Sequence, residues 1–347
     1  MEAGVPASSA RMTAALDAAM LVEEGTARFG RGDLEGAVAS WRAAVAIDPR
    51  LAEAWFDLAN AEDALGDPRT AIESYRRALE IRPDLPEAWN NLGNACVHLG
   101  SFDAAIEAYR KALDVQGDLF ECWFNLGTAH SDLAELDEAI RCLRKALEIK
   151  PDAHEAWYNL GFAWASLGDQ SAAADAYGRA SALVPGDYET WYNLGNACLE
   201  LGRVDDAIRA FEASLTAHDG DYDVWNNLGN ALVQADRSAE ARACFGRALE
   251  LNPSYDLSWN NLGNVLEESG ALAEAQQAYE RAVALVPDQA TYRLNLASAL
   301  ARANEAGRAI EHLARAVELA PEIRSLLPGF GEFAALLDDP RLLTAHD

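Results

Sequence analysis

The sequence predicts an all-α array of stacked helical repeats, and three observations support this fold class. Tryptophan recurs every 34 residues without an insertion or a deletion, which indicates one structural unit copied in tandem. Within each copy, the apolar residues follow helical spacing. The composition is rich in alanine, leucine and glutamate and poor in β-branched runs, which favours helix. The recurring tryptophans are Trp55, Trp89, Trp123, Trp157, Trp191, Trp225 and Trp259.

The chain begins with a segment that we expect to lie outside the array. Residues 1–17 form this N-terminal tail, and residues 1 to about 10, which include Gly4 and Pro6, are expected to be disordered. Arg11 to Asp17 are able to extend the first helix of the array.

One repeat, residues 86–119, shows how each copy is built. Its first half places four apolar or small residues at i, i+3, i+4 and i+7, which marks one face of a helix: Trp89, Leu92, Gly93 and Cys96. Residues 102–113 again follow helical spacing, and Gly100 lies between the two segments, where a turn is needed. Each repeat is therefore predicted to be a pair of antiparallel helices, whose backbones approach closely at small residues such as Gly93.

The repeated pattern, W-x-x-L-G-x-x-Y followed by A-x-x-x-F, A and P, resembles the tetratricopeptide repeat. The first and last repeats are atypical, because Leu21 and Arg293 stand where tryptophan belongs. The resemblance implies a right-handed superhelical solenoid whose first helices line a concave groove. It covers residues 18–323 in nine repeats, namely 18–51, 52–85, 86–119, 120–153, 154–187, 188–221, 222–255, 256–289 and 290–323.

After the last repeat, residues 324–347 form a predicted capping segment. It contains one or two short helices interrupted by Pro328 and Gly329. An apolar stripe in this segment is expected to cover the end of the stack: Phe330, Phe333, Leu336 and Leu337.

A row of asparagines provides the first candidate binding site. Asparagine is a mediocre helix former, so its recurrence at one helical position calls for a reason. A carboxamide is both donor and acceptor, and it can bond the C=O and N–H of an extended peptide. The row is similar to the one in the repeat domain of O-linked N-acetylglucosamine transferase. The alternative is that these residues, the ladder asparagines, only solvate their face: Asn91, Asn125, Asn159, Asn193, Asn227, Asn261 and Asn295.

Aromatic residues flank this row and complete the predicted peptide-binding set. Phe124, Tyr158 and Tyr192 each precede a ladder asparagine by one residue, and Phe162 follows Asn159 by three. Aromatic side chains in a groove are common interface anchors. The alternative is that they pack against neighbouring helices.

The net charge and the absence of known motifs limit the classes of possible partner and function. With 28 basic and 56 acidic residues the formal charge is −28, so nucleic acid and anionic membranes are poor partners and an extended, neutral-to-basic peptide or protein is favoured. No catalytic, nucleotide-binding or metal-binding motif is found, so we expect neither enzymatic activity nor a cofactor. The five cysteines form no C-x-x-C pair, which indicates reduced thiols in a cytoplasmic protein. Residues 337–342 resemble the closing segment common in bacterial repeat arrays of this type, which suggests a bacterial source.

The sequence therefore predicts a scaffold that holds a partner's peptide in its groove. Two alternatives remain open. One is an array that assembles with copies of itself into a homo-oligomer through its ends or its convex face. The other is a targeting module for an enzyme on another chain.

Overall fold

The computed structural model describes residues 7–343, and the regular elements in that range are all helices. The chain forms two compact parts, an N-terminal unit (Met1–Leu183) and a C-terminal unit (Val184–Asp347). The N-terminal unit contains α1 (Ala7–Phe29), α2 (Leu34–Ile47), α3 (Ala52–Ala64), α4 (Pro68–Ile81), α5 (Pro86–His98), α6 (Phe102–Val115), α7 (Phe120–Asp132), α8 (Leu136–Ile149), α9 (His154–Ser166) and α10 (Gln170–Leu183).

The C-terminal unit continues the same pattern and ends in short helical turns. Its elements are α11 (Tyr188–Glu200), α12 (Val204–Ala217), α13 (Tyr222–Gln234), α14 (Ser238–Leu251), α15 (Asp256–Glu268), α16 (Leu272–Leu285), α17 (Ala290–Arg302), α18 (Ala306–Leu319), α19 (Ile323–Leu326), η1 (Leu327–Gly329), η2 (Gly331–Phe333) and α20 (Pro340–Leu343).

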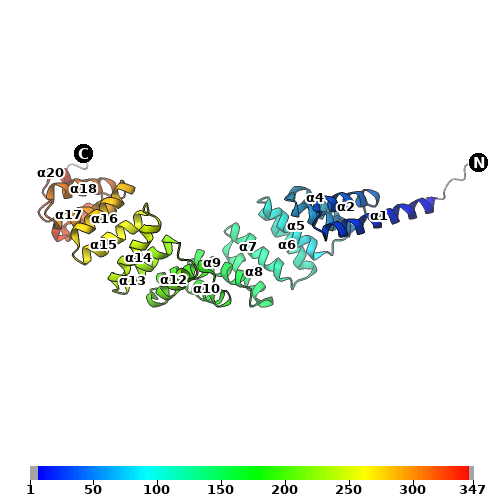
Figure 1. Ribbon diagram of the computed structural model, residues 1–347, viewed down its shortest axis with the longest axis horizontal. Coiled ribbons are helices and arrows are strands. Elements are labelled where there is room, and N and C mark those ends of the chain that lie inside the picture. The colour runs from blue at the N-terminus through cyan, green and yellow to red at the C-terminus, as the bar shows by residue number, and fades with distance from the viewer. Residues whose placement is uncertain (1–6, 344–347) are drawn as a thin grey trace, which may run out of the picture. The chain divides into compact units, whose positions relative to one another are not determined.

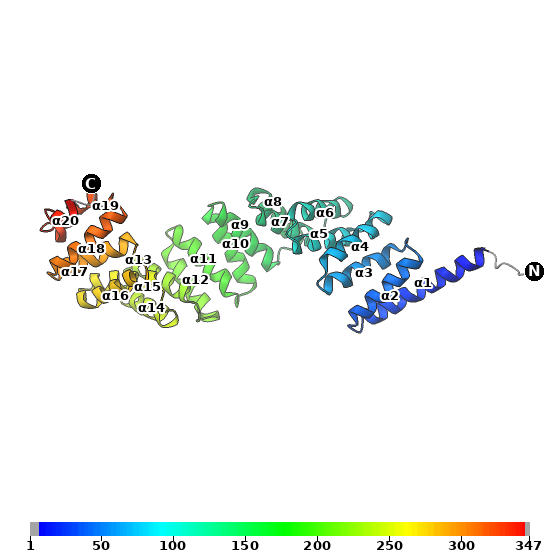
Figure 2. The same ribbon diagram turned by 90° about the horizontal axis from the view of Figure 1, so that it is seen from above.

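Up to α18 the helices run as antiparallel pairs (Figure 1). Within each unit, every odd-numbered helix packs on the even-numbered helix that follows it, and that second helix packs on the first helix of the next pair (Figure 2). This arrangement confirms the predicted tandem helix–turn–helix repeats. The first pair is longer than predicted, because α1 begins at Ala7, inside the segment assigned to the tail. The remainder of the segment expected to be disordered, residues 1–6, lies outside the described residues.

The turn inside each repeat contains a residue in the left-handed conformation. Gly100 has φ +68°, which a residue without Cβ adopts at little cost. The corresponding turns of three other repeats place Ala134, Asp236 and Asn304 at φ +57°, +56° and +63°. The turn geometry is therefore kept even where glycine is absent.

In seven of the nine repeats, a glycine in the first helix makes room for a ring or a branched side chain, whereas the second and last repeats have alanine there. A Cβ on Gly93 would lie 2.4 Å from the ring of Tyr109, and one on Gly263 would lie 2.4 Å from Tyr279. Both tyrosines are almost completely buried. The small residue therefore seats the large side chain of its own second helix, rather than bringing two backbones together as the sequence suggested.

The recurring tryptophans tie each repeat to the end of the one before it. Their rings are half-buried, and the indole N–H of Trp89 donates to the carbonyl of Pro83 at 2.8 Å. The other six make the same bond six residues back, at 2.8 to 3.1 Å. In the last repeat, Nε of Arg293 donates to Pro287 at 2.6 Å. Arg293 thus makes the bond of the tryptophan that it replaces.

The predicted stripe after the last repeat covers the apolar end of the C-terminal unit. Phe333 is fully buried and Leu336 nearly so, both in one cluster with Leu296, Leu300 and Leu313 of the last helix pair. Leu337 packs at the edge of this cluster, whereas Phe330 is partly exposed.

Candidate functional site

The ladder asparagines lie on the first helices of consecutive repeats and are half-buried. Three ladder asparagines of the C-terminal unit, Asn227, Asn261 and Asn295, each bond a side-chain oxygen 31 residues earlier, in the preceding repeat. Asn227 donates to Asn196 at 3.0 Å and Asn261 donates to Asn230 at 3.0 Å. These bonds join the repeats in register.

A second set of acceptors strengthens this network in the C-terminal unit. Asn261 also donates to Asn226 at 3.2 Å, and Asn295 donates to Asn260 at 2.9 Å. Asn226 and Asn260 are 3% and 8% exposed, and Ser258, which is fully buried, donates to Asn226 at 2.9 Å. Because buried polar groups are costly when unbonded, this network contributes to cohesion between repeats.

In the N-terminal unit, the network becomes thinner at Asn159, whereas Asn125 also bonds a second acceptor, Asn90, at 3.1 Å. Asn91 donates to Asn60 at 2.9 Å, and Asn125 donates to Asn94 at 3.0 Å. Asn159 makes a single contact, to the hydroxyl of Thr128 at 3.3 Å.

The acceptors of this network were missed from the sequence. Asn60, Asn94 and Asn264 each also accept a hydrogen bond from a tyrosine hydroxyl of their own repeat, at 2.7 to 2.8 Å. Burial raises the pKa of those tyrosines, so the hydroxyls remain protonated donors. The sequence does contain a signal for these acceptors, because a polar residue recurs three positions after most ladder asparagines.

These contacts determine what the ladder offers to a ligand. The amide N–H groups of Asn125 and Asn261 are used within the chain, while their side-chain oxygens accept no hydrogen bond from any described residue. The oxygens of Asn159 and Asn295 are likewise unbonded within residues 7–343. The available groups are therefore acceptors, suited to a peptide N–H.

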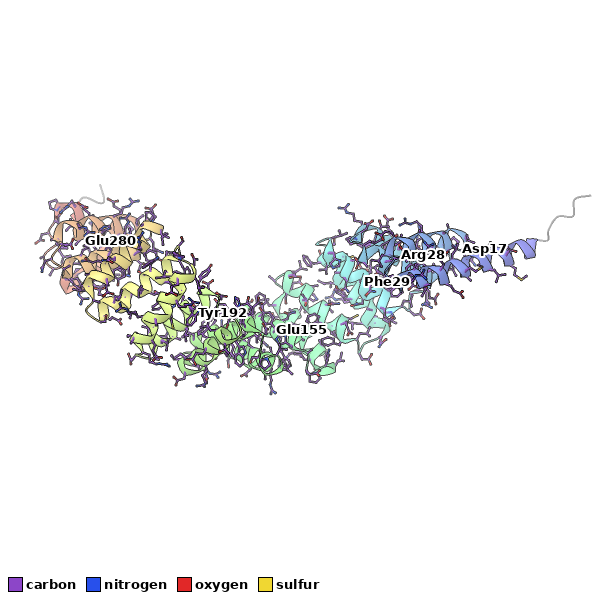
Figure 3. The ribbon with its side chains drawn as sticks, viewed as in Figure 1. Asp17, Arg28, Phe29, Glu155, Tyr192 and Glu280 are labelled. Atoms are coloured by element: carbon purple, nitrogen blue, oxygen red, sulfur yellow. The ribbon has the colours of Figure 1, made fainter. Side chains whose placement is uncertain are left out.

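The predicted aromatic residues differ in their surroundings. Phe124 stacks on Phe120, with ring centroids 5.9 Å apart. Tyr158 packs edge-on against Tyr177 at 5.8 Å, and Tyr192, labelled in Figure 3, packs on Phe211 at 6.2 Å. Phe162 is 51% exposed.

A cavity of about 280 Å³ lies beside Asn125, lined chiefly by first helices of the N-terminal unit; we call it the α5–α7 pocket. Phe124 and Asn125 of α7 line it with Asn94 and His98 of α5 and with Asp63 of α3. It is the cavity that brings a ladder asparagine and a predicted aromatic residue together.

Each of three larger cavities is lined by one first helix and by the second helices before and after it. Their volumes are about 430, 490 and 590 Å³, and each is lined by one recurring tryptophan: Trp123, Trp157 and Trp225. The second of them also contains Trp164. The sequence did not single out this surface, and it is the competing site for a partner.

The cysteines are buried and free. Burial raises the pKa of Cys122 to about 12 and that of Cys142 and Cys244 to about 11, so these thiols are neutral at pH 7. In the described part of the chain, no cluster of histidine, cysteine and acidic residues is arranged to hold a metal ion. Nor does any helix between residues 7 and 343 have the length and apolar character to cross a membrane.

The helix pairs and their amide-lined first helices define a helical-repeat protein, and family comparisons agree. A family model described as the C-terminal domain of cilia and flagella-associated protein 70 matches residues 103–326, which is more than half of the chain. A tetratricopeptide-repeat model matches residues 22–86 and 56–118. The chain therefore belongs to this family of tetratricopeptide-repeat proteins. No curated protein matches it.

Solved structures provide a fold comparison. The crystal structure of YrrB, described as a tetratricopeptide-repeat protein with an unusual peptide-binding site, is 21% identical, with a TM-score of 0.51 over 54% of this chain and 96% of YrrB. A structure of MamA is 30% identical, with a TM-score of 0.47 over 49% of this chain and 92% of MamA. MamA from Desulfovibrio magneticus RS-1 is 21% identical over 49% of this chain and 97% of its own, with a TM-score of 0.46.

Proposed function

We propose that this protein is a non-enzymatic scaffold that holds an extended segment of a partner protein along its first helices. The observation that carries the proposal is the recurrence of unbonded side-chain oxygens at one helical position, on Asn125, Asn159, Asn261 and Asn295. An extended peptide presents N–H groups at regular intervals, and each neutral hydrogen bond contributes about 0.5–1.5 kcal/mol net. The peptide-binding site in the description of YrrB agrees with this class of function.

The proposed contacts comprise the ladder and its aromatic neighbours. They are Asn91, Asn125, Asn159, Asn193, Asn227, Asn261, Asn295, Phe124, Tyr158, Phe162 and Tyr192. Phe162 is the aromatic anchor with the most exposed surface among them. Because the net charge is −28, a neutral or basic segment is favoured over nucleic acid or an anionic membrane. We place the protein in the cytoplasm, with the nine repeats spanning residues 18–323 and the capping segment spanning 324–347.

The proposal is tested in two steps, because the partner must first be found. A pull-down with the intact chain and mass spectrometry would identify candidates, and overlapping peptides of each candidate would locate the bound segment. Calorimetry would then compare Phe162→Ala and Asn159→Ala with the native chain. We expect each to weaken binding at least about threefold, since each removes one contact of this size.

The matched control is Phe29→Ala, because Phe29 is 42% exposed and lies outside the proposed contact set. Circular dichroism would verify that all variants are folded. Native affinity in both Phe162→Ala and Asn159→Ala would move the site to the tryptophan-lined cavities and refute the proposal.

One observation favours self-assembly as the second candidate function. Met12, Leu16 and Met20 are spaced by four residues on α1 and are 67%, 61% and 68% exposed. Exposed apolar stripes mark interaction surfaces. Light scattering at several concentrations would show a rising mass that Leu16→Asp abolishes, whereas a constant monomer mass would exclude this function.

A further inference from the structure

The α5–α7 pocket lies where three first helices end. Asp63 is the next-to-last residue of α3, His98 is the last of α5, and Asp132 is the last of α7. The carboxyl end of a helix carries partial negative charge, so acidic residues there are disfavoured and basic ones are stabilising. Two acids at these ends therefore call for a reason outside the stability of the helices.

The hydrogen bonding of the two acids is incomplete. Oδ1 of Asp63 is buried and accepts no hydrogen bond among the described residues, although Nδ1 of His98 lies 3.4 Å away. Asp132 is exposed and has no ion-pair partner within residues 7–343. Of the residues that line the pocket, His98 is the only one able to carry positive charge.

The walls between these acids fit an aliphatic stem. Val97, Ala129 and the ring of Phe124 are the apolar residues that line the pocket with the two acids. The side-chain oxygen of Asn125, whose amide nitrogen bonds Asn90 and Asn94, adds an uncharged acceptor. The pocket thus combines apolar walls with acceptors and negative charge.

Resting on the proposed function, we infer that the α5–α7 pocket binds one basic side chain, arginine or lysine, of the segment held along the first helices. The stem lies against Phe124 and Val97, and the charged head reaches Asp63 and Asp132. The pocket therefore sets the position in the partner segment at which positive charge is required.

The inference can be tested without knowing the partner, by using five pools of fluorescein-labelled nonapeptides. The central residue is arginine, lysine, citrulline, norleucine or glutamate, and the flanking positions are mixtures of alanine, serine, leucine and asparagine. Fluorescence anisotropy with the full chain gives an affinity for each pool. We expect the arginine and lysine pools to bind about tenfold more tightly than the norleucine and citrulline pools, as for charge-assisted hydrogen bonds. The difference in affinity between the arginine pool and the lysine pool identifies which of these side chains the pocket prefers.

The double variant Asp63→Asn/Asp132→Asn should reduce this preference to less than about twofold while leaving the norleucine pool unchanged. The matched control is Asp114→Asn/Asp137→Asn, which removes the same charge from α6 and α8 and should keep the preference. Equal binding of the arginine and norleucine pools, or an unchanged preference in the first double variant, would overturn the pocket assignment and leave the scaffold function intact. Binding of no pool would also overturn the pocket assignment. The scaffold function would fail with it only if the pulled-down partner bound Phe162→Ala and Asn159→Ala with native affinity.

Discussion

The amide network of the C-terminal unit differs from that of the N-terminal unit, although both use the same helical position. In the C-terminal unit, Asn261 bonds two acceptors, one of which is the buried Asn226. In the N-terminal unit, Asn125 also bonds two acceptors, but its second acceptor, Asn90, is only half-buried. Asn159 makes one contact of 3.3 Å, and Phe162 occupies the position three residues later. One row of residues can therefore hold repeats together in one place and leave side chains available to a ligand in another.

We infer that the two units contribute unequally to partner binding and to stability. The α5–α7 pocket and the exposed Phe162 both belong to the N-terminal unit. We therefore expect changes on this face to affect mainly partner binding in the N-terminal unit and mainly stability in the C-terminal unit.

The largest expected effect is alkaline destabilisation. Above pH 9 the unfolded chain loses thiol protons that buried Cys122, Cys142 and Cys244 keep, because their folded pKa values are about 12, 11 and 11 against an ordinary 9.0. Stability is therefore complete below pH 9 and falls as the pH rises towards 11 to 12, by about 1.4 kcal/mol per pH unit for each thiol.

Urea titrations at pH 8 and pH 10 measure this loss. The double variant Cys122→Ala/Cys142→Ala should flatten the pH dependence more than Cys198→Ala/Cys244→Ala, because burial raises the pKa less for Cys198 than for the other three thiols. If the free energy of unfolding depends equally on pH in the two double variants, the units do not differ in the contribution of their thiols.

The next effect concerns the buried amides. Asn226→Ala leaves the buried hydroxyl of Ser258 without its acceptor, at about 1–3 kcal/mol, and removes one of the two acceptors of the Asn261 amide. Asn90→Ala should cost less, because Asn90 is half-buried. It accepts from the amide of Asn125, as Asn226 does from Asn261, but its second donor is the weak thiol of Cys122 instead of a hydroxyl. Denaturant titration compares the two, and the reverse order would contradict the division of tasks.

A third prediction tests whether the two units differ only on the helix face that carries the ladder asparagines. Gly161→Ala and Gly263→Ala would each place a methyl group against a buried tyrosine, at 2.8 Å and 2.4 Å from the ring. Overpacking of this kind costs about 1–3 kcal/mol, and we expect both variants to lose stability to a similar extent. If thermal unfolding shows that only one of the two variants loses stability, the packing of the cores differs between the two units as well.

The smallest stability effect is expected for Asn159→Ala. It removes one weak hydrogen bond and introduces a better helix former, so the free energy of unfolding should change by less than about 0.5 kcal/mol. The matched variant Asn261→Ala loses two hydrogen bonds and should cost more. Equal losses in urea titrations would mean that the ladder is equally structural in both units.

The helix pairs could be predicted because one repeat contains the whole pattern. Gly100 marks the turn, and Trp89 and Tyr109 mark the packed faces, all within 34 residues. The bonding of the ladder could not be predicted, because Asn125 bonds Asn94, 31 residues earlier, and that contact depends on how one repeat stacks on the next. That Asp63 and Asp132 line the same pocket is harder still to predict, because these residues belong to repeats that are two apart in the sequence.

The hydrogen bond from Arg293 to Pro287 has a consequence for recognising and designing such arrays. The junction between repeats requires an N–H donor on a side chain long enough to reach a carbonyl six residues back, and an indole is one of at least two side chains that meet this requirement. A search that demands tryptophan would miss the last repeat of this chain, whereas one that accepts either donor would count it. A designer could likewise exchange the two at a junction to trade buried aromatic surface for positive charge without losing the bond.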